Sequence, residues 1–106
     1  MMGKLEALAV LMNLANLADL WTTKVGLSLG LKEANPFAEA ILKTYGFQGM
    51  ATYKIAFPFL SSTACLTAET PKEKLASALL MASLGIVYAF CSLNNVLVIA
   101  LKLAKQ

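Results

Sequence analysis

Residues 5–29 read LEALAVLMNLANLADLWTTKVGLSL, and this stretch decides the fold of the chain. As an α-helix, its 25 residues extend ~37 Å, which is enough to cross a ~30 Å hydrocarbon core with some tilt. The stretch carries Asn13, Asn16 and Asp19, and it runs far beyond the short apolar core of a cleaved signal peptide. We therefore predict a retained transmembrane helix that stops at Gly30.

The composition of the whole chain agrees with a membrane environment. Of its 106 residues, 58% are hydrophobic and 14% are charged, and the mean hydropathy is +0.68. A soluble domain usually carries about 25% charged residues. A chain this short has a large surface for its volume and cannot bury so much apolar material. We expect one all-α membrane domain over residues 1–106, with the lipid bilayer as its solvent.

Turn and capping signals divide the remaining sequence into further helices. Pro36 suits the first turn of a short helix, which at about ten residues is too short to span and is expected to lie at the membrane interface. Pro71 near the start of the last helix, with Glu73 in its first turn, is a second start signal, and Thr70 precedes it. We predict three transmembrane helices at about 5–29, 47–68 and 75–101, and a short interfacial helix at about 36–45.

Several function classes are disfavoured by the residue types present. The net charge of +3 comes from nine lysines that mostly flank apolar runs, as interfacial anchors do, so no nucleic-acid partner is expected. Histidine is absent, and Cys65 and Cys91 both lie in apolar runs, which excludes a disulfide framework and an ordinary zinc site. No phosphate loop or nucleophile–base pair is present. We expect no enzymatic activity, no cofactor and no metal.

A polar stripe runs along the first predicted helix. Asn16, Asp19 and Thr23 are spaced i, i+3, i+7 and therefore share one face. A carboxylate near the middle of a bilayer is costly unless it is paired, neutral or facing a polar cavity. Lys54 lies at a comparable depth in the second helix and is the expected partner of Asp19. Pro58 follows four residues later, and its ring should free the Lys54 carbonyl.

The third helix repeats this polar pattern. Tyr88, Cys91 and Asn95 are spaced i, i+3, i+7, and Asn95 falls in the half of the membrane that holds Asp19. The predicted polar intramembrane cluster comprises Asn16, Asp19, Thr23, Lys54, Tyr88 and Asn95. It serves either as a buried ion pair that fixes the helix register or as part of an ion or proton path, and the structural interpretation is favoured.

Two further patterns carry predictions about packing and about the first loop. Small residues allow helices to approach closely in lipid, and such a stripe on the third helix contains Ala78, Ala82, Gly85 and Ala89. The loop motif contains Glu33, Asn35 and Pro36. Glu33 is either a ligand or a first-turn charge on the short helix, and the second interpretation is favoured.

Together these motifs resemble those of an uncharacterised family of small bacterial and archaeal three-span membrane proteins, known only as a domain of unknown function. The resemblance covers most of the chain. It implies a multi-pass protein of a prokaryotic cell membrane, and it brings no activity with it. Cys91 and Asn94 lie outside the pattern. The residues that carry the resemblance are Asn16, Asp19, Thr23, Gly30, Glu33, Asn35, Pro36, Lys54, Tyr88 and Asn95.

Two functions follow as expectations. The first is an accessory or scaffold subunit that packs against other helices in a homo-oligomer or a larger membrane complex, because the chain is too small to enclose much by itself. The alternative is a small oligomeric transporter or channel for an ion or solute that uses the Asp19–Lys54 pair. The expected partners are the lipid bilayer and other membrane subunits or copies of this chain.

Overall fold

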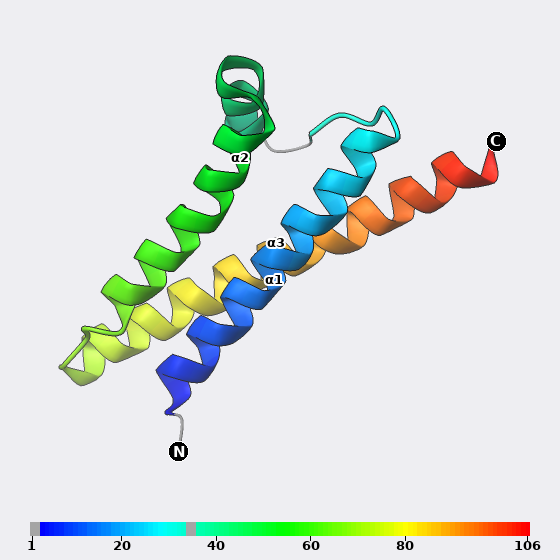
Figure 1. The fold of residues 1–106 in the computed structure, drawn as a ribbon. Helices are drawn as coiled ribbons and strands as arrows, with labels where there is room; N and C mark the ends of the chain where they lie inside the picture. Colours follow the sequence, from blue (N-terminus) through cyan, green and yellow to red (C-terminus); the bar gives the residue numbers. More distant parts are fainter. Residues whose placement is uncertain (1–2, 34–35) are drawn as a thin grey trace.

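The computed structural model describes residues 3–33 and 36–106 and consists of helices joined by short turns. The helices are α1 (Lys4–Ser28), α2 (Pro36–Cys65) and α3 (Pro71–Ala104), so the all-α fold with three long helices is confirmed. α1 packs mainly on α3, while α2 packs on α1 and touches α3 less. Figure 1 shows α3 crossing α1 and the two chain ends at opposite ends of the bundle.

α1 ends in a glycine turn of the Schellman type. The Leu31 N–H donates to the Gly26 carbonyl over 2.9 Å, and the Gly30 N–H donates to the Leu27 carbonyl over 3.1 Å. Gly30 has a φ of 87°, a left-handed conformation that glycine adopts without steric cost. The predicted stop at Gly30 is confirmed. The turn folds the chain back at the end of α1, and the Glu33 carboxylate that follows it contacts Lys54 of α2.

The short helix predicted at 36–45 is present as the first part of α2, which a non-helical residue separates from the rest, and its place at a membrane interface stays a prediction. These residues form the first part of α2, and the only non-helical residue inside that helix is Gly46, with φ 79° and ψ −174°. Because this one glycine redirects the chain within a single residue, no loop separates the two parts. In Figure 1 the first turns of α2 are seen nearly end-on, whereas the rest of the helix runs along its length.

α3 begins where the capping signals predict. The Thr70 hydroxyl accepts a hydrogen bond from the Glu73 N–H over 3.1 Å and donates to the Glu73 carboxylate over 3.0 Å, and Pro71 occupies the first turn. The helix then continues for 34 residues, beyond the predicted 75–101. Of the described helices, only α3 is long and apolar enough to cross a membrane by length and composition. α1 and α2 are interrupted by polar side chains.

The side chains of the described residues are distributed in an unusual way. Large apolar side chains are exposed along all three helices, including Leu11 on α1, Phe59 on α2 and Leu93 on α3. The buried polar residues are nearly as numerous as the buried apolar ones, which is the reverse of the pattern in a soluble protein. The buried set comprises Ala9, Met12, Ala38, Met50, Cys65 and Met81 with Asn16, Asp19, Thr23, Lys54 and Ser62, and Gly26 and Pro58 are buried as well.

Candidate functional site

The ammonium of Lys54 is the centre of a buried cluster between the helices. Lys54 Nζ lies 2.9 Å from Glu33 Oε2, 3.4 Å from Asp19 Oδ2 and 3.2 Å from Thr23 Oγ1. The three charged side chains are 9% exposed or less. An ammonium has three N–H donors, so each oxygen is matched by one donor. Two carboxylates and one ammonium give this arrangement a formal charge of −1.

The backbone of Lys54 is also held by α1. Asn16 Nδ2 donates a hydrogen bond to the Lys54 carbonyl. That carbonyl lacks its usual helical donor, because the residue four positions later is Pro58, which has no N–H. α2 nevertheless keeps helical dihedrals through Pro58, which is buried. A side chain of one helix thus replaces a backbone hydrogen bond of another.

Asn95 connects α3 to the same cluster. Its Nδ2 lies 3.1 Å from Asp19 Oδ1, 2.9 Å from Thr22 Oγ1 and 3.2 Å from Thr23 Oγ1. Every hydrogen bond of the Asn95 side chain within the described residues therefore uses the amide nitrogen. We call Asn16, Asp19, Thr23, Glu33, Lys54 and Asn95 the buried cluster.

Two weaker polar contacts extend the cluster along α1. Asn13 Nδ2 lies 3.1 Å from Ser62 Oγ on α2, and the Ser92 hydroxyl of α3 donates to the Ala15 carbonyl over 3.4 Å. The helical spacing predicts Ser61 on the face that carries Lys54. In the structure Ser62 is the buried serine of this face, and Ser61 is only half-buried.

Glu33 is the member of the buried cluster that the spacing of the sequence motifs did not place there. Its carboxylate contacts Lys54, whereas the sequence favoured a role at the start of the next helix. The signal was Gly30, because a glycine at this position of a helix end commonly folds the chain back. Of the other loop-motif residues, Pro36 begins α2 and Asn35 lies outside the described residues.

Tyr88 takes a different position from the other predicted cluster residues. Its side chain lines a cavity together with Asp19 and packs against the apolar core, and in the described part of the chain it makes no hydrogen bond to the buried cluster. The structure therefore brings Asn16, Asp19, Thr23, Lys54 and Asn95 together and leaves Tyr88 at their edge.

The small residues of α3 lie partly at its crossing with α1. A Cβ added at Gly85 would lie 3.6 Å from Met12 Cα, so the two backbones approach closely there. Ala82, Gly85 and Ala89 line an apolar groove beside α1. Ala78 lies apart from them and lines a hollow at the N-terminal end of the bundle.

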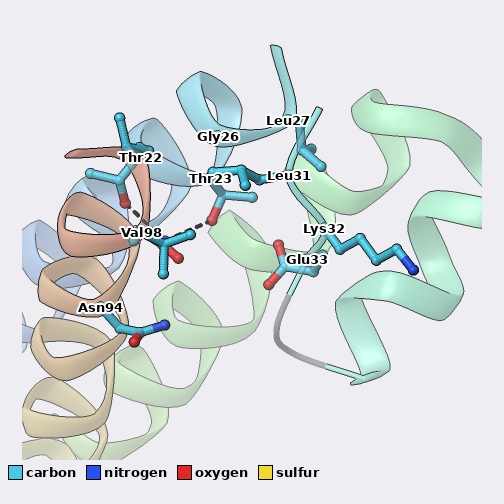
Figure 2. A pocket seen from close by; sticks show the side chains of 11 residues that line it. Thr22, Thr23, Gly26, Leu27, Leu31, Lys32, Glu33, Asn94 and Val98 are labelled. Carbon is cyan, nitrogen blue, oxygen red and sulfur yellow. Dashed lines mark hydrogen bonds between the residues drawn. The ribbon is translucent and has the colours of Figure 1, made fainter. Parts of the chain in front are cut away.

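Two cavities flank the buried cluster. One of about 160 Å³ is lined by residues that include Thr23, Lys32 and Glu33, and one of about 310 Å³ is lined by Asp19 and Glu33 among others. Glu33, Asn94 and Asn95 line both. Figure 2 shows the side chains of Glu33 and Asn94 projecting toward the same space from opposite walls, while the ammonium of Lys32 points away from it.

The fold and the site define a class: a three-helix protein with a small charged cluster buried between its helices and many large apolar side chains exposed on the outside. Residues 10–101 match the family described as a domain of unknown function (DUF5658), and the chain belongs to this family. The match supports the expected family of unknown function and attaches no activity to it. No curated protein and no solved structure matches the chain.

Proposed function

We propose that this chain is an integral membrane protein whose three helices cross the cytoplasmic membrane of a prokaryotic cell. In this proposal it acts as an accessory or scaffold subunit in a homo-oligomer or a larger membrane complex. The observation that carries the proposal is the reversed side-chain distribution, with Leu11 and Leu93 exposed while Asp19 and Lys54 are buried. In water, an apolar surface this extensive leads to association or aggregation. In lipid it is the surface expected.

The polar residues of α1 and α2 are compatible with three spans. Asn16, Asp19 and Lys54 face the interior of the bundle, so their hydrogen-bonding groups are satisfied by the protein rather than by lipid. The outward face of α1 still carries exposed apolar side chains such as Leu14 and Leu17. Mean hydropathy averages the two faces and therefore underestimates how apolar the outward face is.

The scaffold role is supported by the contrast between the buried cluster, which joins the three helices, and the exposed faces of α3. The buried cluster joins α1, α2 and α3 through side chains, which fixes their register. α3 buries little of its own surface in the chain, with Met81 as its one buried residue in the described structure. Its long apolar faces are therefore available to lipid and to neighbouring helices.

The proposal is tested by measuring whether the protein resides in the membrane and what its oligomeric mass is. The full-length chain should stay in the membrane fraction after an alkaline carbonate wash, which removes peripheral proteins. Native mass spectrometry from mild detergent should show oligomers or co-purified membrane subunits. Release by the wash would contradict membrane integration, and a monomer alone in mild detergent would contradict the scaffold role.

A second candidate function is a small oligomeric transporter or channel for an ion or solute. The observation that favours it is the pair of cavities beside the buried cluster, both lined by Glu33 and Asn95. Flux across liposomes should then fall for Asp19→Asn. The matched control is Glu39→Gln, which neutralises an acid paired with Lys43 away from the cavities. Equal flux for all three proteins would exclude this function.

A further inference from the structure

Exposed lysines gather at one end of the three-helix bundle. The last turn of α1 and the turn after it lie beside the last part of α3, because Gly26, Lys32 and Ile99 line one cavity. Figure 1 shows the ends of α1 and α3 on the side of the molecule away from the N-terminus. The Lys32 ammonium points out of that cavity (Figure 2). We call the four exposed lysines here the basic end: Lys24, Lys32, Lys102 and Lys105.

The side-chain charge of the molecule is concentrated at the basic end. Within the described residues, the lysines that form salt bridges are Lys43, with Glu39, and Lys54 in the buried cluster. The four lysines of the basic end therefore keep their positive charge. The opposite end of the bundle, where Lys4, Glu6 and Lys74 line one hollow, carries as many acids as lysines. Its charged residues are Lys4, Lys72, Lys74, Glu6, Glu69 and Glu73.

The lysines of the basic end lie beside exposed apolar side chains. Trp21 is 65% exposed and precedes Lys24 by three residues, so the two share a face of α1. Tryptophan is enriched at the level of the lipid headgroups. On α3, Leu101 and Leu103 flank Lys102 and are 54% and 50% exposed. Positive charge next to apolar surface suits the boundary between headgroups and acyl chains, whereas a nucleic acid would use the charge alone.

We propose that the basic end binds the headgroups of anionic phospholipids in preference to zwitterionic ones. The lysines extend their ammonium groups to the headgroup phosphates while their alkyl stems lie along apolar surface. Clusters of four or more lysines beside a membrane-spanning helix are attracted to anionic lipid, and this attraction falls off within a Debye length of about 10 Å. The inference rests on the proposed function, because the helices must lie in a bilayer, and it names the lipid that partners one end of them.

Trp21 is the only tryptophan of the chain and reports which lipid lies beside the basic end. The full chain is placed in vesicles of phosphatidylcholine and phosphatidylglycerol in equal amounts. In each sample one of the two lipids carries brominated acyl chains, which quench tryptophan fluorescence. At low salt the quenching should correspond to an enrichment of phosphatidylglycerol by about fivefold, the factor that one lysine contributes at an anionic surface. At about 1 M sodium chloride the enrichment should disappear.

Charge removal at each end shows whether the basic end is responsible. Lys24→Gln, Lys32→Gln, Lys102→Gln and Lys105→Gln combined should make the two brominated lipids quench equally. The matched control combines Lys4→Gln, Lys72→Gln and Lys74→Gln at the opposite end and should keep the enrichment. Both variants change exposed side chains and leave the buried cluster intact.

The outcomes separate the inference from the proposed function. Equal quenching by the two brominated lipids in the unaltered chain overturns the inference, and so does a loss of the enrichment in both variants, since total charge would then select the lipid. Quenching of Trp21 by neither brominated lipid would show that α1 does not lie in the bilayer. That result contradicts the proposed function instead.

Discussion

At the scale of single residues, Lys54 is the side chain on which the buried cluster depends. Lys54→Met removes the ammonium that faces both Asp19 and Glu33 and leaves two buried carboxylates without it. Breaking a buried ion pair by removing one partner costs about 3–5 kcal/mol, so we expect a loss of that size in the free energy of unfolding. Titration of folded protein in mixed micelles with sodium dodecyl sulfate measures it.

The matching control removes the charge of all three ionisable residues in the buried cluster. A triple variant that combines Lys54→Met with Asp19→Asn and Glu33→Gln should lose less stability than Lys54→Met alone, because no charge then remains buried. Losses that simply add across the single variants would show that the three groups do not interact energetically.

Asn16 has a separate role that the backbone of α2 creates. Asn16→Ala should cost about 1–3 kcal/mol in the free energy of unfolding, because it leaves the buried Lys54 carbonyl without a donor. In a Pro58→Ala background the restored N–H at position 58 can serve that carbonyl, and the cost of Asn16→Ala should fall. A double-mutant cycle measures the difference. An equal cost in both backgrounds would contradict the compensation.

At the scale of elements, the signals that predicted the helices are local ones. The stop at Gly30 and the start at Thr70–Pro71 depend on a few neighbouring residues, so the sequence was sufficient for them. A break between the helices at 36–45 and 47–68 was predicted, but a glycine does not indicate whether a loop or a single bent residue makes it, and in the structure Gly46 alone makes it. The position of Glu33 depends on how the chain folds back after α1, which spacing alone does not specify.

Gly30 is the element-scale position where a substitution should have the clearest effect. Its φ of 87° is strained for a residue with a Cβ, so Gly30→Ala should cost about 1–2 kcal/mol in the free energy of unfolding. Gly30→Asn should cost less, because asparagine tolerates this conformation better. Unfolding titrations of both variants give the comparison. If Gly30→Ala and Gly30→Asn lower the free energy of unfolding equally, the left-handed conformation at position 30 is not the cause of the loss.

At the scale of the whole molecule, the buried cluster combines local and distant information. The polar stripe of α1 follows from helical periodicity, and that periodicity places Asn16, Asp19 and Thr23 on one face. Contact with Lys54 and Asn95 requires the packing of three helices, which the structure provides. Tyr88 shares a face of α3 with Asn95 and lines the same cavity, but within the described residues it makes no hydrogen bond to the buried cluster. Periodicity selects a helix face, whereas the crossing of the helices determines which residues of that face meet.

The exposed face of α3 gives the test that separates lipid from water as the solvent of this fold. Leu93 is 69% exposed near the middle of the apolar part of α3. Replacing this leucine by lysine breaks no polar pair. In water, such a surface substitution changes the free energy of unfolding by less than about 0.5 kcal/mol. At the centre of a bilayer-spanning helix, insertion of a lysine costs about 2.5–3.5 kcal/mol.

Leu93→Lys should therefore reduce the fraction of chain that integrates into membranes during cell-free synthesis with lipid vesicles. The control is Leu103→Lys, which places the same charge at the end of α3, where the long side chain can extend to the interface. The chemical change is the same at both positions. A large loss of membrane integration for Leu93→Lys with little loss for Leu103→Lys would therefore show that the two positions lie at different depths in a bilayer. Equal behaviour of the two variants would mean that α3 does not lie across a bilayer.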